Sequence, residues 1–278
     1  DYILSRSKAR DPTRKSHYNH MNQADQVLQW LQRDHPDLRL GPNDIKQWLE
    51  ALTAEGCSTW TVHHKLTKLR HILDQAVHLG MIRTNSAKEV KIGQPKTAAP
   101  RRGLTPDEIK AVLDKSLEYR STADFLSGAL PVALRLGLYA GLRNEEITWL
   151  KWDAVDFDRR VIMVQETKRE DTGQRWRPKD AELRSLGVKQ ELTDFLLAER
   201  RRQQKAGVLG VFVIPPRGAG QVDARKRPSA PEQLQRTFSK FLDLEDITSG
   251  GGKPTFYCLR HTFCTALLRA GVDIETVR

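Results

Sequence analysis

The sequence predicts a mostly α-helical protein with two domains and one small antiparallel β-sheet. Apolar residues recur at three- and four-residue spacing over most of the chain, as they do in amphipathic helices. Residues 160–166 break this pattern with a run of β-branched residues that is typical of a strand. Residues 91–103, KIGQPKTAAPRRG, lack periodicity and mix proline, glycine and cations, which indicates an interdomain linker. The predicted domains are residues 1–92 and 104–278, joined by a linker at 93–103.

The first domain is predicted to consist of helices. Apolar stripes at residues 27–31 and 45–52 predict two short helices, separated by the turn signal GPND at 41–44. The clearest helix covers residues 59–78, where apolar residues recur at helical spacing. Its other faces carry histidines and cations, which include His64, Lys65, Lys68 and Arg70. Such a basic face is either a solvated helix surface or a contact for nucleic acid.

The second domain is predicted to open with a helix near residue 104. Thr105 suits the N-cap, Pro106 suits the first helical position, and acidic residues fill the first turn. Residues 125–140 are apolar almost all round, which predicts a buried helix, and Gly141 interrupts that pattern.

A small β-structure follows in the same domain. The strand at 160–166 is expected to pair with residues 184–188 across a long hairpin that contains Gly173. Helical patterns then return, and a glycine-rich loop precedes the last of them. These further elements are expected at residues 190–206, at 231–242, and after the loop at 249–252.

The charge of the chain favours a polyanionic partner. The sequence has 46 lysines and arginines against 35 acidic residues, a net charge of +11, which suits nucleic acid or an acidic membrane surface. No apolar run approaches the roughly 20 residues of a membrane span, and no leader precedes a cleavage site, so we expect a cytoplasmic protein. The three cysteines show no CxxC pairing, which indicates neither a disulfide framework nor a zinc site.

The candidate catalytic residues are cationic. The sequence has no GxxxxGK(S/T) phosphate loop, no HExxH and no GxSxG elbow. Arg143 precedes an acidic pair that ends at Glu146, and Arg260 and His261 stand at the predicted start of the last helix. Taken one at a time, an arginine beside two acids is usually part of an ion pair, and a histidine at a helix start is usually packed.

Together, these residues resemble the two arginine boxes of tyrosine recombinases, the phage integrase family. The boxes are AGLRNEEI at residues 140–147 and LRHTFCT at residues 259–265. Between them, WRPKD at residues 176–180, with Arg184 downstream, resembles the β-hairpin that holds the catalytic lysine of the family. The pairing of two boxes is specific, and the hairpin between them strengthens the resemblance.

The resemblance covers nearly the whole chain from about residue 20. LTPDEI at residues 104–109 resembles the start of the family's catalytic domain. WTV at 60–62 and GMIRTN at 80–85 resemble the core-binding domain that clamps DNA. The resemblance therefore implies an α-helical, SAM-like core-binding domain followed by a mixed α+β catalytic domain.

The resemblance also implies roles for the residues of the two boxes. Arg143 and Arg260 are expected to hold the phosphodiester, because two planar guanidiniums suit the non-bridging oxygens on which negative charge develops. Glu146 is expected to orient the first arginine or a neighbouring group. The site that the resemblance implies also contains His261, which follows the second arginine.

Further roles are expected in the hairpin and at the start of the last helix. The resemblance assigns protonation of the leaving 5′-oxygen to Lys179, with Lys168 as the alternative because it also follows the strand. Tyr257 stands where the family usually has a histidine, three residues before the second arginine; it either binds a phosphate or packs at the helix start. The family's nucleophilic tyrosine belongs to a later box, which is expected beyond Arg278.

The chain lacks an initiator methionine and ends within an amphipathic pattern, so we expect a fragment that is inactive in cleavage. The resemblance implies that the complete protein is a site-specific recombinase or integrase of a mobile element such as a phage or transposon. It would form a 3′-phosphotyrosyl intermediate without cofactor, metal or ATP. The implied partners are double-stranded DNA and other copies of the chain in a homo-tetramer on DNA, in the nucleoid and not at a membrane. The alternatives are a DNA-binding relative without chemistry and a type IB topoisomerase.

Overall fold

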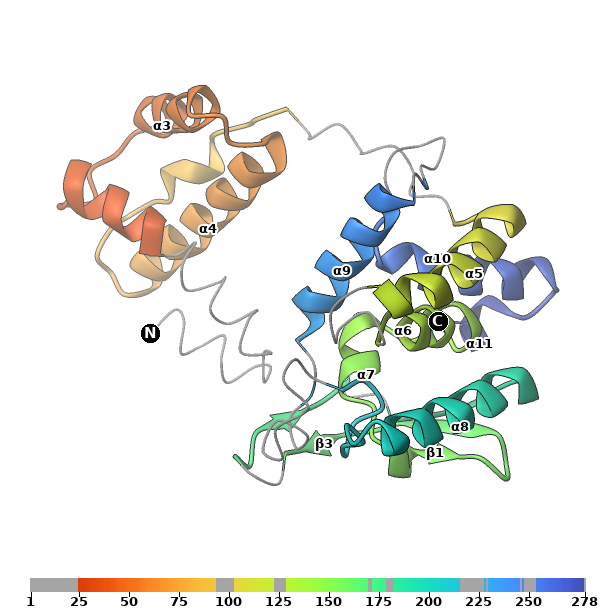
Figure 1. Ribbon diagram of the computed structural model, residues 1–278. Helices are drawn as coiled ribbons and strands as arrows, with labels where there is room; N and C mark the ends of the chain where they lie inside the picture. The colour runs from red at the N-terminus through yellow and green to blue at the C-terminus, as the bar shows by residue number, and fades with distance from the viewer. Residues whose placement is uncertain are drawn as a thin grey trace. The chain divides into compact units, whose positions relative to one another are not determined.

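The computed structural model is drawn in Figure 1, and its described part has several gaps. It describes residues 25–93, 103–122, 129–169, 172–178, 183–215, 230–245 and 254–277, together with Pro228 and Ile247. The chain divides into two compact units, residues 1–98 and 99–278, and the division falls within the segment predicted as a linker. No helix in the described ranges is long and apolar enough to cross a membrane.

The first unit is helical, as the periodicity predicts. A helix covers residues 25–34 of the described chain, and it is followed by α3 (Pro42–Ala54), α4 (Thr59–His78) and the short 3₁₀ helix η1 (Ser86–Lys88). Ser58 caps α4 by accepting a hydrogen bond from the backbone N–H of Thr61 at 3.2 Å. The apolar stripes of these helices form one core, which includes Val27, Leu31, Ile45, Leu49, Leu66, Leu69 and Leu73.

The second unit combines helices with short strands. Its helices are α5 (Pro106–Thr122), α6 (Leu130–Tyr139), α7 (Asn144–Thr148), η3 (Trp152–Ala154), α8 (Gln190–Lys205), α9 (Pro231–Leu244), α10 (Tyr257–Arg269) and α11 (Ile274–Val277). Its strands are β1 (Val155–Asp156), β2 (Val161–Val164), β3 (Thr167–Lys168), β4 (Arg175–Trp176) and β5 (Arg184–Gly187). The predicted fold class, mostly α with a small antiparallel sheet, is confirmed.

The start of α5 follows the predicted capping pattern. The hydroxyl of Thr105 accepts a hydrogen bond from the N–H of Glu108 at 3.3 Å, and the Glu108 carboxylate accepts one from the N–H of Thr105 at 2.8 Å. Pro106 is the first residue of the helix. The first helix of the second unit therefore begins at the residue that the sequence predicts.

The β-structure differs in one respect from the prediction. Strands β1, β2 and β5 form an antiparallel sheet in which Val164 lies opposite Arg184, so the predicted pairing of these two segments is confirmed. The predicted strand at 160–166 is too long, however, because β2 ends at Val164. Residues 167–168 form β3, which pairs with β4 in a second, two-stranded sheet inside the long hairpin. Gly173 lies in the connection between β3 and β4 with a positive φ of 67°.

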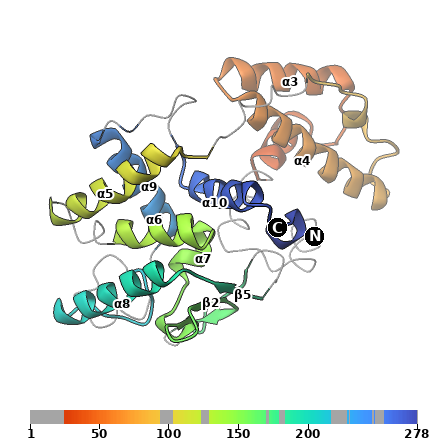
Figure 2. The same cartoon turned by 90° about the vertical axis from the view of Figure 1, so that its right-hand side faces the viewer.

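The buried helix α6 is the centre of the second unit. Figures 1 and 2 show it between α5, α9 and α10 on one side and α8 on the other. Apart from Arg135 and Tyr139 its residues are apolar, and eight of its ten are buried, as the sequence predicts for a central helix. Two glycines allow α10 to approach this helix closely. A Cβ at Gly137 would lie 2.9 Å from the Cβ of Leu259, and one at Gly141 would collide with the ring of Phe263.

Candidate active site

The first arginine box forms the turn between α6 and α7. Gly141 adopts φ +62°, a conformation that glycine tolerates best, and the chain then extends to Arg143 at the N-cap of α7. The backbone N–H of Arg143 donates to Oε2 of Glu146 at 2.8 Å, and its Nη1 donates to Oε1 of the same carboxylate at 2.9 Å. Glu146 therefore fixes both the helix start and the side chain of the arginine.

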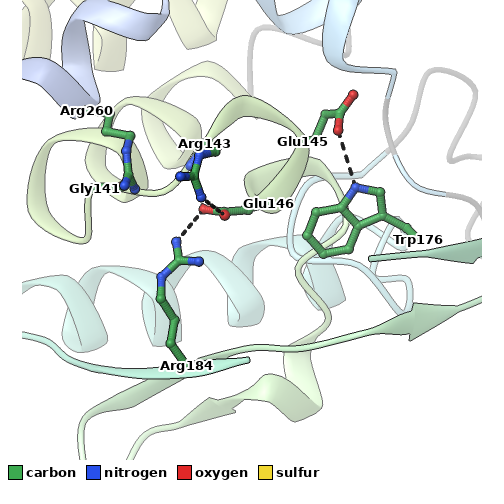
Figure 3. Close-up of polar contacts among 7 residues, drawn as sticks. All are labelled: Gly141, Arg143, Glu145, Glu146, Trp176, Arg184 and Arg260. Atoms are coloured by element: carbon green, nitrogen blue, oxygen red, sulfur yellow. Dashed lines mark hydrogen bonds and ion pairs between the residues drawn. The ribbon is translucent and has the colours of Figure 1, made fainter. Parts of the chain in front are cut away.

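A second arginine reaches the same carboxylate from the sheet. Nη2 of Arg184, the first residue of β5, donates to Oε2 of Glu146 at 2.7 Å. The Glu146 side chain is 1% exposed, and those of Arg143 and Arg184 are 27% and 20% exposed. Figure 3 shows Glu146 between the two guanidiniums. Nη1 of Arg184 is buried and has no hydrogen-bond acceptor among the described residues.

Glu146 is ionised in this setting. Burial alone would raise the pKa of its carboxyl, since the charged form loses hydration. The hydrogen bonds from Arg184 and Arg143 outweigh that effect and hold the pKa below its ordinary value. One buried negative charge is thus shared by two arginines, and the cluster is positive overall.

The second arginine box meets the first through a backbone carbonyl. Nη1 of Arg260, in α10, donates to the carbonyl oxygen of Gly141 at 2.5 Å, although the two residues are 119 positions apart. The side chain of Thr262 holds α10 to the start of the unit, because its hydroxyl accepts from the N–H of Leu104 and donates to the carbonyl of Cys258, each at 2.8 Å. The structure therefore brings together the two boxes that the resemblance paired.

The two-stranded sheet inside the long hairpin contacts the helix of the first box. The indole Nε1 of Trp176, in β4, lies 3.4 Å from a carboxylate oxygen of Glu145 as a hydrogen-bond donor (Figure 3). The same indole stacks on Trp149 with ring centroids 6.2 Å apart. Lys168, in β3, is exposed. Lys179 lies outside the described residues, so its role stays a prediction.

The residues at the start of α10 have different environments. Tyr257 is the first residue of the helix and is 55% exposed, so it is not packed into the core there. His261 is half-buried next to Arg260. The roles that the resemblance gives to Tyr257 and His261 stay predictions.

The four residues expected on the basic face of α4 differ in their exposure. His64 is exposed and Lys65 is half-buried, but Lys68 is only 7% exposed. The guanidinium of Arg70 donates to the backbone carbonyls of Ala87 and Val90 at 3.0 and 2.7 Å. The four residues therefore do not form one exposed cationic face, because helical spacing alone does not show which side chains are covered.

Sequence reasoning also missed residues that build the site. The resemblance implies that Glu146 orients Arg143 or a neighbouring group, but no motif or spacing indicates that Arg184 shares the same carboxylate. The carbonyl of Gly141 was not foreseen as the acceptor for Arg260, and Gly137 was not singled out as a packing residue. The closest signal was the position of Arg184 within the hairpin motif.

Comparison with solved structures shows that integrases have a similar fold. The integrase of transposon Tn1549 in complex with transposon right end DNA is 19% identical with a TM-score of 0.72, over 99% of this chain and 88% of that one. A lambda integrase tetramer bound to a Holliday junction is 18% identical with a TM-score of 0.66, over 99% of this chain and 73% of that one. At these identities the likeness shows the fold.

Comparison of sequences shows the family. The model of the phage integrase family matches residues 102–278, which include both arginine boxes, and the chain belongs to this family of tyrosine recombinases. A tyrosine recombinase XerC-like protein of Caldanaerobacter subterraneus subsp. tengcongensis is 24% identical over 260 residues, which are 84% of this chain. The aligned part is 61% of that relative, so the chain spans less than two thirds of its length.

Proposed function

We propose that this chain is part of a site-specific DNA recombinase or integrase, which cuts and rejoins duplex DNA through a 3′-phosphotyrosyl intermediate. The observation that carries the proposal is the junction of the two arginine boxes, in which Arg260 donates to the carbonyl of Gly141 beside the Arg143–Glu146 pair. Two guanidiniums on adjoining segments suit a single phosphate group. The family membership of the chain supports the same reaction.

The proposed chemistry matches charge to the transition state. A tyrosine oxygen attacks phosphorus, the bond from phosphorus to the 5′-oxygen breaks, and negative charge grows on the non-bridging oxygens. Arg143 and Arg260 stabilise that charge because their donors are already fixed before the reaction. Attack by a 5′-hydroxyl reverses the step and joins a new strand, so the phosphate bond energy is kept. The nucleophile is expected beyond Arg278, as in the family pattern.

The departing 5′-oxygen needs a proton, and Lys179 is the proposed donor. It stands in the hairpin motif, between the hydrogen-bonded Trp176 and the anchored Arg184. Lys168 is the alternative donor on β3. Tyr257 is exposed beside the second box and offers a hydroxyl that can hydrogen-bond a phosphate oxygen.

The proposed partners are duplex DNA and further copies of the chain. The net charge of +11 supports DNA binding, and it would make affinity fall steeply with salt. Two solved structures of similar fold are an integrase in complex with transposon DNA and an integrase tetramer on a Holliday junction, which supports the same assembly here. Of the four α4 residues expected to contact DNA, His64 is exposed and Lys65 is half-buried, so these two are the proposed contacts.

A non-catalytic DNA-binding relative is the alternative, because no nucleophile has been assigned within the 278 residues. The test is a suicide duplex, nicked near the crossover site, given to the full-length natural protein. We expect a protein–DNA adduct that survives denaturation and maps beyond Arg278, and no adduct with residues 1–278 alone. Arg143→Ala or Arg260→Ala should lower the yield by about 10²- to 10³-fold, whereas Arg159→Ala, in an exposed turn, should not.

Three results would contradict the proposal. Full-length protein that binds DNA but gives no adduct would favour the non-catalytic alternative. An adduct on Tyr257, or one formed by the 278-residue chain, would show that the nucleophile was misplaced. Relaxation of supercoiled DNA without joining of two sites would favour the topoisomerase.

Lys179→Ala should slow cleavage while duplex affinity stays nearly unchanged, because a general acid acts mainly in the transition state. A substrate with a 5′-bridging sulfur has a leaving group that needs no proton, so it should restore cleavage by this variant. Lys168→Ala is the matched comparison from the same hairpin. Selective rescue of Lys168→Ala by the sulfur substrate would reverse the assignment.

A further inference from the structure

The Glu146 carboxylate is shared in an unequal way by the two arginines that contact it. Oε1 accepts one hydrogen bond, from Nη1 of Arg143. Oε2 accepts two, from the backbone N–H of Arg143 and from Nη2 of Arg184. A carboxylate oxygen has two lone pairs, so the contacts at Oε2 use both of them. The side chain of Arg143 is therefore limited to Oε1.

We propose that Arg184 is a positioning residue that keeps the contact between Arg143 and Glu146 to a single hydrogen bond. An arginine beside a carboxylate commonly makes two parallel hydrogen bonds to it. Without Arg184, Oε2 would have a free lone pair, and the guanidinium of Arg143 could turn to take it. With Arg184 in place, the other donors of Arg143 are kept for the scissile phosphate. This inference rests on the proposed function.

The charges of the cluster support the same role. The Glu146 side chain is 1% exposed, so a single arginine beside it would form a buried pair with no net charge. Two arginines on one carboxylate leave one positive charge in the Arg143–Glu146–Arg184 cluster, which adjoins the contact between Arg260 and the carbonyl of Gly141. The phosphate in the transition state carries more negative charge than the ground-state diester. The excess positive charge of the cluster therefore stabilises the transition state more than the bound substrate.

Arg184 also links the hairpin to the arginine box. It is the first residue of β5, where it pairs with Val164 of β2, and it stands five positions after Lys179 in sequence. The strand that returns from the lysine segment is thus held to α7 by a buried ion pair of 2.7 Å. Through this contact, one side chain sets the arginine geometry and fixes the strand next to the proposed acid.

The experiment measures single-turnover cleavage of a nicked suicide duplex by the full-length protein. The variants are Arg184→Met, which removes the charge and the donor, and Arg184→Lys, which keeps both. Arg159→Met is the matched control, since it removes an exposed arginine from an ion pair in the β1–β2 turn. Each protein is tested on the normal diester and on a duplex whose scissile group is a methylphosphonate. In this group an uncharged methyl replaces one non-bridging oxygen.

We expect Arg184→Met to slow cleavage of the diester by roughly 100-fold, because a small misplacement of a catalytic group has an effect of this size. The affinity for duplex DNA should stay unchanged. Arg184→Lys should recover most of the rate because one charged donor is enough for Oε2. On the methylphosphonate the penalty of Arg184→Met should shrink to less than about 10-fold, since less charge has to be neutralised. The control should match the wild type on both substrates.

Equal penalties on the two substrates would overturn the inference, because a purely structural role weakens both reactions alike. Normal diester cleavage by Arg184→Met would also overturn it, while the proposed function would stand. A wild-type protein that gives no adduct at all would instead refute the proposed function. If Arg184→Met unfolds, Arg184→Gln, which keeps an uncharged donor, is measured on the same two substrates and judged by the same ratio.

Discussion

Replacing Gly141 by alanine should destabilise the second unit and separate the two arginine boxes. Gly141 has φ +62°, and a Cβ at this position would collide with the ring of Phe263 in α10. Its carbonyl oxygen also accepts the hydrogen bond from Arg260. One added methyl group therefore disturbs the backbone conformation, the packing of α10 and the site at the same time.

The magnitude follows from two separate effects. A left-handed conformation costs a non-glycine residue roughly 1–2 kcal/mol. Overpacking a tight contact costs about 1–3 kcal/mol more, because the Phe263 ring has to move away. The free energy of unfolding of this unit should thus fall by about 2–5 kcal/mol, a large part of the roughly 5–15 kcal/mol that a domain has.

The assay is hydrogen exchange in increasing urea, with peptides from residues 99–278 followed apart from those of the first unit. Gly207→Ala is the matched control, because Gly207 has φ +68° but open space where its Cβ would lie. It should show only the backbone cost. Equal losses in the two variants would refute the packing argument. Adding Phe263→Ala to Gly141→Ala should recover part of the lost stability. The absence of any recovery would also refute the packing argument.

Three further predictions follow from contacts in each unit. The pKa of Glu146 is held below its ordinary value of 4.5, so its ionised form stabilises the fold above that pH. The free energy of unfolding, measured in urea, should therefore fall as the pH drops below 4.5. The stability of Glu146→Gln should fall less steeply over the same pH range. Lys65→Ala should weaken duplex binding and lower the salt slope by about 1, whereas Arg70→Ala should lower the stability of the first unit, as seen by thermal unfolding, because two backbone carbonyls lose their donor. Gly137→Ala should weaken the packing of α6 on Leu259, which slower adduct formation and faster hydrogen exchange in α10 would report.

The elements of the fold could be predicted because their signals are local. Residues 59–78 repeat their apolar positions with helical spacing, and the structure has α4 at those residues. Thr105 and Glu108 are three residues apart, so their reciprocal capping is visible in the sequence itself. The β-branched residues predict the strand at 160–166, and a long hairpin predicts its pairing with 184–188, but neither predicts the end of β2 at Val164 or the second sheet.

The sequence alone also determined which residues to examine. Arg143 and Arg260 stand in two motifs whose pairing indicates the family, and the match to the phage integrase family confirms that identification. Motif spacing names residues without giving their contacts, however. Lys68 and Arg70 show the difference, because both belong to a basic helix in the sequence, yet one is buried and the other holds the backbone of the following segment.

Only the tertiary structure decided how the site is held together. Arg184 and Glu146 are 38 positions apart, and Arg260 and Gly141 are 119 positions apart, so no helical or strand period relates them. These contacts exist because β5 runs beneath α7 and because two glycines let α10 approach α6 closely. Helix and strand patterns depend on near neighbours, whereas the partner of a buried charge depends on which elements pack around it.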